Sequence, residues 1–247
     1  MKISLKIRIC LFVAFAMLAF AMPSVAQNIR TVVLVKVKMD QEENWRATIK
    51  DFIALDKKAG SKQNVTVWDS QTGPFQHAVV VYSSTWKELG EDDPAMKGSE
   101  TEEARLYARL NSVTDSIETW VDEMQPDLSI RSNDIPPFIR VGRTKVIASK
   151  LDEVKAIFRD VLFPAIKKSG ATDWGVAYAR YGTPTNEIHT YLGLKGWADL
   201  DGPIGSQKAM TADEWKAFQA KLTPLLESTE YSIWKFAPDL SYIAPSK

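Results

Sequence analysis

The stretches QPDLSI at residues 125–130 and APDLSYI at residues 237–243 repeat one short phrase along the chain. Pro126 and Pro238 begin the shared PDLS core, so the copies are 238 − 126 = 112 residues apart. Three more pairs of segments recur in the same order at nearly the same spacing: KKAG at 57–60 with KKSG at 167–170, WKEL at 86–89 with WADL at 197–200, and SETE at 99–102 with TADE at 211–214. Ordered matches at a nearly constant offset predict a duplicated unit, and the repeated phrase ends each copy.

The first part of each copy is predicted to be a strand followed by a helix. In the first copy, residues 33–39 alternate between apolar and polar in the manner of a strand, and apolar residues at helical spacing follow over 45–53. In the second copy we expect the corresponding strand at 146–151 and the helix at 154–165. Pro164 lacks a backbone N–H and should kink that second helix.

The rest of each copy is predicted to contain two strands, a helix and a last strand. Ser99 and Thr211 each begin the helix as the first residue of a capping box, with Glu102 and Glu214 three positions later. The remaining strands are predicted at 64–71, 77–83 and 119–124, then at 173–181, 188–194 and 231–236. The element order is therefore βαββαβ, twice.

The N-terminal segment has the pattern of a secretory signal peptide. A basic start precedes the uncharged apolar run ICLFVAFAMLAFAM at 9–22, and small residues at 24 and 26 predict cleavage before Gln27. A membrane span needs roughly 20 apolar residues, which makes an uncleaved anchor the weaker alternative. We expect residues 1–26 to be removed and the protein to be periplasmic or secreted, with no membrane attachment afterwards.

Composition excludes several classes of function. The only cysteine, Cys10, lies in the predicted signal peptide, so the chain after it has neither a disulfide nor a thiol nucleophile. The full chain carries 31 basic and 31 acidic residues, which argues against nucleic acid as a partner because nucleic-acid binding requires a basic surface. No spacing of histidines or cysteines is typical of a metal site, so we predict neither a metal nor a cofactor.

The duplicated βαββαβ order, with its WxxL segment after the third strand, resembles the dimeric α+β barrel superfamily. The resemblance implies an α+β fold, in which two ferredoxin-like βαββαβ units in tandem pack their sheets face to face as an intramolecular barrel. It places the first unit at 27–130 and the second at 131–247. The superfamily includes cofactor-free monooxygenases, haem-degrading enzymes, haem-dependent chlorite dismutases, dye-decolourising peroxidases and members without known activity. Its haem enzymes hold iron with a helical histidine, and this chain departs from that pattern, because both of its histidines fall in predicted strands.

Candidate site residues gather around the histidine of the second copy. A tight hairpin over 182–187 would place Arg180 opposite His189 and Tyr178 opposite Tyr191, with Trp174 on the same face. We predict that this face lines the cleft between the sheet and the helices of the second copy. His189 would be a neutral base beside Arg180, which would hold an anion, and Trp174, Tyr178 and Tyr191 would bind an aromatic or carboxylate ligand.

The first copy offers a second, weaker set of candidates. His77 begins the corresponding strand, and Asp69 or Gln71 would orient its imidazole. A histidine at a strand end is, however, often only a polar residue at the rim of a barrel. That structural alternative stands beside the functional one for both histidines.

Three functions remain open from the sequence. The first is an exported protein that binds a small aromatic or amphipathic ligand, as a monomer or a homodimer. The second is a cofactor-free monooxygenase or isomerase that uses His189 and Arg180. The third is a structural or assembly module whose pockets are filled by its own side chains.

Overall fold

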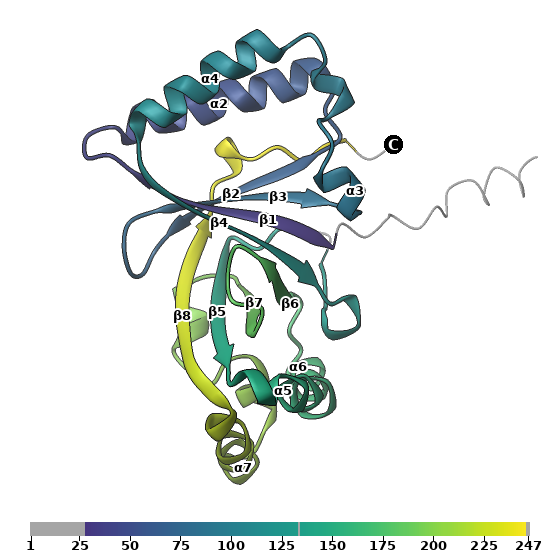
Figure 1. The fold of residues 1–247 in the computed structure, drawn as a ribbon. Coiled ribbons are helices and arrows are strands. Elements are labelled where there is room, and N and C mark those ends of the chain that lie inside the picture. Colours follow the sequence, from purple (N-terminus) through teal and green to yellow (C-terminus); the bar gives the residue numbers. More distant parts are fainter. Residues whose placement is uncertain (1–27, 133, 246–247) are drawn as a thin grey trace, which may run out of the picture.

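A computed structural model describes residues 28–132 and 134–245 of the chain, and the predicted signal peptide lies outside these residues. The first half follows the βαββαβ order, with a short helix α3 after the third strand (Figure 1). Its elements are β1 (Ile29–Val37), α2 (Glu42–Ala59), β2 (Asn64–Ser70), β3 (His77–Ser83), α3 (Trp86–Leu89), α4 (Glu100–Val113) and β4 (Thr114–Met124).

The second half repeats this order with a broken first helix. Its elements are β5 (Phe138–Val146), α5 (Leu151–Ile157), a π-helical segment (Phe158–Leu162), α6 (Phe163–Lys168), β6 (Trp174–Tyr181), β7 (Glu187–Leu194), α7 (Ala212–Leu222) and β8 (Leu226–Phe236). No helix in residues 28–132 and 134–245 is long and apolar enough to cross a membrane.

The eight strands form one closed barrel in the order β1-β3-β2-β8-β5-β7-β6-β4. Within each half the order is that of a ferredoxin-like sheet, and the halves join where β2 pairs with β8 and β4 pairs with β6. Figure 1 shows α2 and α4 over the outside of the first sheet, and α5, α6 and α7 over the outside of the second. The predicted fold, two ferredoxin-like units whose sheets face each other as an α+β barrel, is confirmed.

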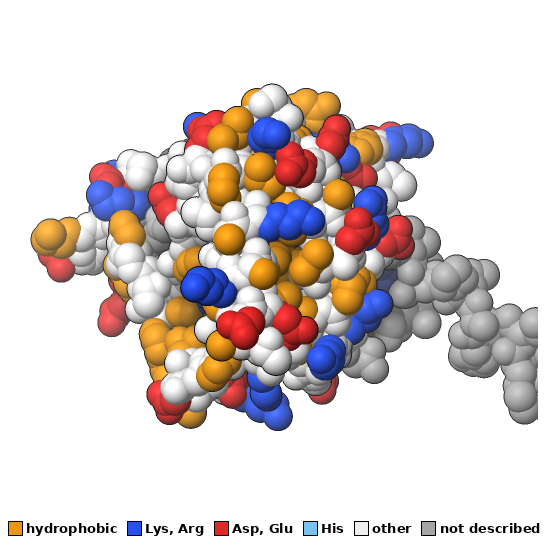
Figure 2. Space-filling view, turned by 90° about the horizontal axis from the view of Figure 1, so that it is seen from below, with side chains coloured by type: hydrophobic (Ala, Val, Ile, Leu, Met, Phe, Trp, Pro, Cys, Tyr) orange, Lys and Arg blue, Asp and Glu red, His pale blue; other side chains and the backbone are white. Residues whose placement is uncertain are grey.

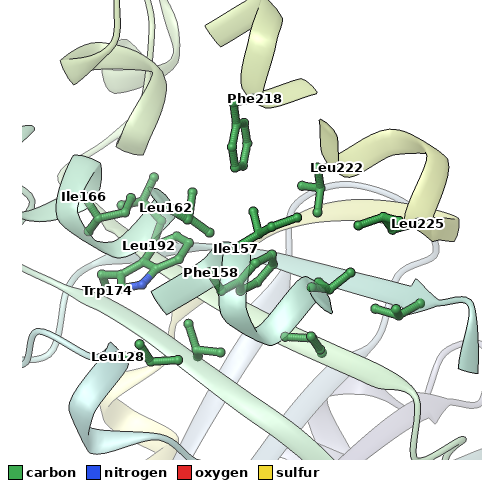
Figure 3. Packing of buried hydrophobic residues seen from close by; sticks show 14 of the residues in the cluster. Leu128, Ile157, Phe158, Leu162, Ile166, Trp174, Leu192, Phe218, Leu222 and Leu225 are labelled. Carbon is green, nitrogen blue, oxygen red and sulfur yellow. The ribbon is translucent and has the colours of Figure 1, made fainter. Parts of the chain in front are cut away.

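The space between each sheet and its own helices is filled by apolar side chains. Under the helices of the first half, Trp45, Ile49 and Ile53 pack against Val35 and Val67. Figure 3 shows the larger cluster of the second half, where side chains of the π-helical segment and of α7 meet strand residues such as Trp174 and Leu192. The space between the sheet and the helices of the second half, where a cleft was predicted, is therefore filled by a packed core.

The repeated PDLS phrase fastens each half to the other. In each copy it forms a 3-10 turn, at Pro126–Leu128 and Pro238–Leu240. Ser241 Oγ, at the end of the second half, accepts a hydrogen bond from the backbone N–H of Val67 at 2.9 Å, while Ser129 Oγ accepts one from Val176 at 3.4 Å.

The leucines of the phrase follow the same exchange. Leu128 lies in the core cluster of the second half and Leu240 in that of the first half. Each half thus contributes the leucine of its PDLS turn to the core of the other half.

Three details of the predicted elements were wrong or incomplete. The first strand of the second half, β5, lies at Phe138–Val146 rather than at 146–151. Small and polar residues interrupt its apolar residues, so the two-residue period of a strand is weak in this segment. Thr211 forms the predicted capping box with Glu214, but Ser99 makes no side-chain cap, and Glu100 instead accepts from Gly98 N–H.

The predicted break at Pro164 is a π-helical segment over Phe158–Leu162, directly before α6. Proline has no N–H to donate to the preceding turn, and a wider turn accommodates the missing hydrogen bond.

Figure 2 shows the molecule from below, where basic, acidic and hydrophobic side chains are interspersed on one face.

Candidate functional site

A cavity of about 650 Å³ lies between the two sheets, inside the barrel. Side chains alternate between the faces of a strand, so Arg30, Val32 and Leu34 of β1 line this cavity, while Val35 packs under the helices. Three indoles line the wall, two from the first half and one from the second: Trp68, Trp120 and Trp234. A largely apolar cavity of this size is typical of sites for small organic molecules.

A second, separate groove of about 480 Å³ runs over the outside of the second half. It lies between α6, together with the π-helical segment before it, and α7. Its lining includes Val161, Pro164, Met210 and Phe218. No candidate residue from the sequence analysis lines it.

His189 lies opposite Ala177 and Arg143, not opposite Arg180 as the tight hairpin predicted. Likewise, Tyr191 lies opposite Gly175 rather than Tyr178. The partner on β6 moves from Arg180 to Ala177, an odd shift of three residues, and an odd shift sends side chains to opposite faces of a sheet.

The predicted constellation is therefore divided between two faces. Trp174, Tyr178 and Arg180 do share one face, as their spacing indicated, and it is the outer one: Trp174 and Tyr178 belong to the core under the helices. Arg180 is exposed, and its Nε donates to Glu123 Oε2 at 2.8 Å. His189 and Tyr191 point the other way, toward the inside of the barrel, where Tyr191 lines the cavity.

Asp122 is the centre of a buried network behind the cavity wall. Arg30 donates to both of its oxygens, with Nε and Nη2 each at 2.8 Å. Tyr191 donates to Oδ2 at 3.0 Å, and His189 Nδ1 lies 3.1 Å from the same oxygen. Arg30 and Asp122 belong to the first half and His189 and Tyr191 to the second, so the network joins the two halves where β4 meets β6.

The network continues from the other ring nitrogen of His189. Nε2 lies 3.3 Å from Glu187 Oε2, and this carboxylate also accepts from Arg143 at 3.3 Å and from Thr183 at 2.7 Å. Arg143 in turn contacts Glu118 at 3.4 Å and lies over the ring of Trp120. Carboxylates flank His189 on both sides, in place of the guanidinium that the sequence predicted.

This arrangement favours the charged form of His189. A carboxylate only accepts hydrogen bonds, so both ring nitrogens must donate, which only the imidazolium can do. Burial alone would lower the pKa of His189, but the hydrogen bonds to Asp122 and Glu187 outweigh it and raise the pKa above its ordinary value. The neutral base predicted at this position is therefore disfavoured.

The carboxylates around His189 respond in the opposite direction. Burial would raise the pKa of Asp122, yet the charge of Arg30 and the hydrogen bond from His189 hold that pKa below its usual range. The hydrogen bond from His189, which acts against burial, lowers the pKa of Glu187 to about 2. Arg30 and His189 thus lie against the carboxylates of Asp122 and Glu187, and the opposite charges compensate one another.

His77 occupies a different environment on the outer face of the first sheet. Its Nδ1 lies 2.7 Å from Asp69 Oδ1 and its Nε2 lies 2.9 Å from Glu42 Oε2, while its ring stacks on Trp45 at 4.0 Å. Asp69 thus contacts the imidazole. Gln71 does not: its Nε2 donates to the backbone oxygens of Asp69 and Ser70.

Several residues of the cavity and of the buried network behind it had not been singled out from the sequence. Arg30 and Asp122 are charged residues at inward positions of strands, and the indoles Trp68, Trp120 and Trp234 share that inward face. A charged residue within an apolar strand was a usable signal. Its partner, however, lies 92 positions away, and only the fold brings the two together. Within the described part of the chain, no group of three or more His, Cys, Asp or Glu side chains is placed to hold a metal ion.

Comparison with known proteins finds similar structures and no similar sequence. No family model and no curated protein matches the sequence. A proposed monooxygenase from Fusobacterium nucleatum superposes with a TM-score of 0.59 at 13% identity, covering 85% of this chain and 93% of the other. An anthrone oxidase-like protein gives 0.57 at 12% identity, covering 87% and 94%.

Chlorite dismutase from Candidatus Nitrospira defluvii, in complex with imidazole, gives a TM-score of 0.55 at 11% identity, covering 85% of this chain and 91% of its own. Identities this low establish the fold and leave the chemistry open. The chain has the α+β barrel fold of these proteins.

Proposed function

We propose that the protein binds a small, mainly apolar or aromatic molecule in the cavity inside the barrel. The observation that carries this proposal is the cavity of about 650 Å³ with three indoles in its wall. Indoles offer large apolar contact areas and flat faces on which an aromatic ring can pack. A module filled by its own side chains would not keep such a volume open, so this cavity weighs against the purely structural alternative.

The polar groups of the wall also favour an apolar ligand. The indole N–H of Trp68 donates to Thr66 Oγ1 at 3.0 Å, and that of Trp234 donates to Ser232 Oγ at 2.8 Å. Arg30 makes a bidentate ion pair with Asp122. The indole N–H of Trp120, in contrast, is buried without a hydrogen-bond partner among the described residues. Since the other groups already have partners, a ligand gains affinity chiefly by burying its apolar surface against the wall.

The alternative function, a cofactor-free monooxygenase or isomerase, has support from the names of structurally similar proteins. Its proposed residues fit it less well. His189 has both ring nitrogens directed at carboxylates, and Arg180 pairs with Glu123 on the outer face. A base needs a free nitrogen within reach of its substrate. Binding is therefore the better supported proposal.

We also propose that the protein is exported, with residues 1–26 removed. The support is the pattern of a basic start, an apolar run and small residues before Gln27. Sequencing the N-terminus of the protein isolated from its own cells tests this, and the expected first residue is Gln27. An intact Met1 in a membrane fraction would contradict it.

Ligand binding is tested with N-phenyl-1-naphthylamine, an uncharged aromatic probe that fluoresces in apolar surroundings. The wild-type protein should bind the probe at one site, and the bound probe should quench the tryptophan fluorescence of the protein. Val141→Trp places a large side chain in the cavity wall and should weaken binding at least tenfold.

The matched control is Lys235→Trp, which adds the same indole at an exposed position of β8. It should bind the probe like the wild type. Equal binding by both variants, with unchanged thermal melting, would show that the probe sits elsewhere and would contradict the proposal.

A further inference from the structure

We propose that the ligand carries a carboxylate, which Arg131 binds at the edge of the cavity while the apolar body of the ligand lies against the indoles. This inference rests on the proposed function and adds the chemical class of the ligand. It concerns a residue that none of the sequence patterns singled out.

Three arginines line the cavity, and two of them are neutralised by the protein. Arg30 makes a bidentate pair with Asp122, and Arg143 pairs with Glu118 and Glu187. Arg131 lines the same cavity, but its hydrogen bond is to the amide oxygen of Asn28 at 3.3 Å. Among the described residues, no carboxylate lies within ion-pair distance of it.

Arg131 is exposed at the edge of the cavity, where a ligand can reach its guanidinium. Desolvation beside the cavity, together with the charge of Arg30 nearby, lowers the pKa of Arg131 below its ordinary value. Asp173 also lines the cavity and acts on Arg131 through its charge, but without an ion pair, and burial raises the pKa of Asp173. A guanidinium between an apolar cavity and another cation gains most from an anion that brings its own carboxylate, because the two groups match in shape and charge.

The fold itself does not require a cation at this position. The bridge between Ile130 and Trp174 in one half corresponds to the bridge between Tyr242 and Val65 in the other. The residue after each bridge lines the cavity, and it is Arg131 in one case and Ile243 in the other. An aliphatic residue occupies the corresponding position in the other half, so the guanidinium is present in one half only.

The test uses two probes with the same ring system, 1-naphthoate and 1-naphthalenemethanol. Affinities are measured from the quenching of tryptophan fluorescence in the full chain. The wild type should bind the carboxylate about tenfold more tightly than the alcohol. Arg131→Gln should lower the affinity for 1-naphthoate by a similar factor and leave the alcohol unchanged, whereas Arg131→Lys should retain part of the preference.

The matched control is Arg105→Gln, which removes an exposed arginine of α4 outside the cavity and should change neither affinity. If Arg131→Gln folds poorly, salt dependence in the wild type replaces it: added salt should weaken binding of 1-naphthoate and not of the alcohol. Equal affinities for the two probes, or no response to Arg131→Gln, would overturn the carboxylate inference alone. Failure of both probes to bind would overturn the proposed function along with it.

Discussion

His77 and His189 have the same kind of partners, but their side chains point to opposite faces of the barrel wall. Each is fully buried, and each ring lies between two carboxylates. His77 faces outward under α2, where it stacks on Trp45, whereas His189 faces inward and joins the two halves behind the cavity wall. Chemical similarity therefore does not make the two positions equivalent.

The strand registers show which positions do correspond. His77 lies opposite Val35 and Ala78 opposite Leu34, while in the second half Ile188 lies opposite Thr144 and His189 opposite Arg143. Val35 and Thr144 each precede, by the same interval, the irregularity near the end of their strand. His189 thus corresponds to Ala78, and His77 to Ile188. A difference of one residue along a strand decides whether a histidine faces a helix or the inside of the barrel.

The largest difference between the two sites should appear when their carboxylates are removed. Asp122→Ala leaves Arg30 and His189 buried without their anion, and this should cost about 3 to 5 kcal/mol of unfolding free energy. Asp69→Ala acts at a partly exposed site where Glu42 remains beside His77, so it should cost roughly 1 kcal/mol. Urea denaturation of both variants at one pH measures the difference. Equal losses would contradict the separate roles of the two faces.

A smaller effect concerns pH and should belong to His189. Its folded-state pKa is raised, so its contribution to stability is present below about pH 6.5 and is lost as pH rises through that pKa. Asp122 and Glu187 have lowered pKa values, so their contributions are present above about pH 4.5 and are lost as pH falls, for Glu187 toward a pKa of about 2. The wild type should be most stable between these limits.

Denaturation midpoints at pH 5.5 and 8.5 in the wild type and in His189→Gln check this dependence. The wild type should lose about 1.4 kcal/mol for each unit by which the pKa of His189 is raised, and His189→Gln should not show that loss. His77→Gln is the matched control, in which the contribution of His189 persists. An undiminished loss in His189→Gln would assign the pH dependence to another group.

The smallest expected effect compares the two PDLS turns. Ser241→Ala removes an acceptor 2.9 Å from Val67 N–H and should cost about 1 kcal/mol. Ser129→Ala should cost less, because its oxygen lies 3.4 Å from Val176 N–H. Thermal melting of the two single variants and of the double variant would show which serine contributes more to stability. A larger loss of stability for Ser129→Ala than for Ser241→Ala would contradict this expectation.

Much of the fold was predictable because it depends on patterns within short segments. The repeated PDLS phrase, the strand alternation and the capping box at Thr211 are local features, and they led to the right element order. That the halves arose by duplication, with a boundary near residue 130, stays a prediction.

The site was less predictable, because it depends on registers between strands. A turn that differs from the tightest hairpin moved the partner of His189 from Arg180 to Ala177 and divided the predicted residues between two faces. The pairing of Arg30 with Asp122 joins residues 92 positions apart, and no local pattern announces it.

A crystal structure of the protein with N-phenyl-1-naphthylamine tests the central claim, that ligands bind inside the barrel. We predict density for the probe between the two sheets, in contact with Trp68, Trp120 or Trp234, with the pair of Arg30 and Asp122 intact beside it. Density under α2 beside His77, or in the groove along α7, with an empty barrel interior, would contradict this claim.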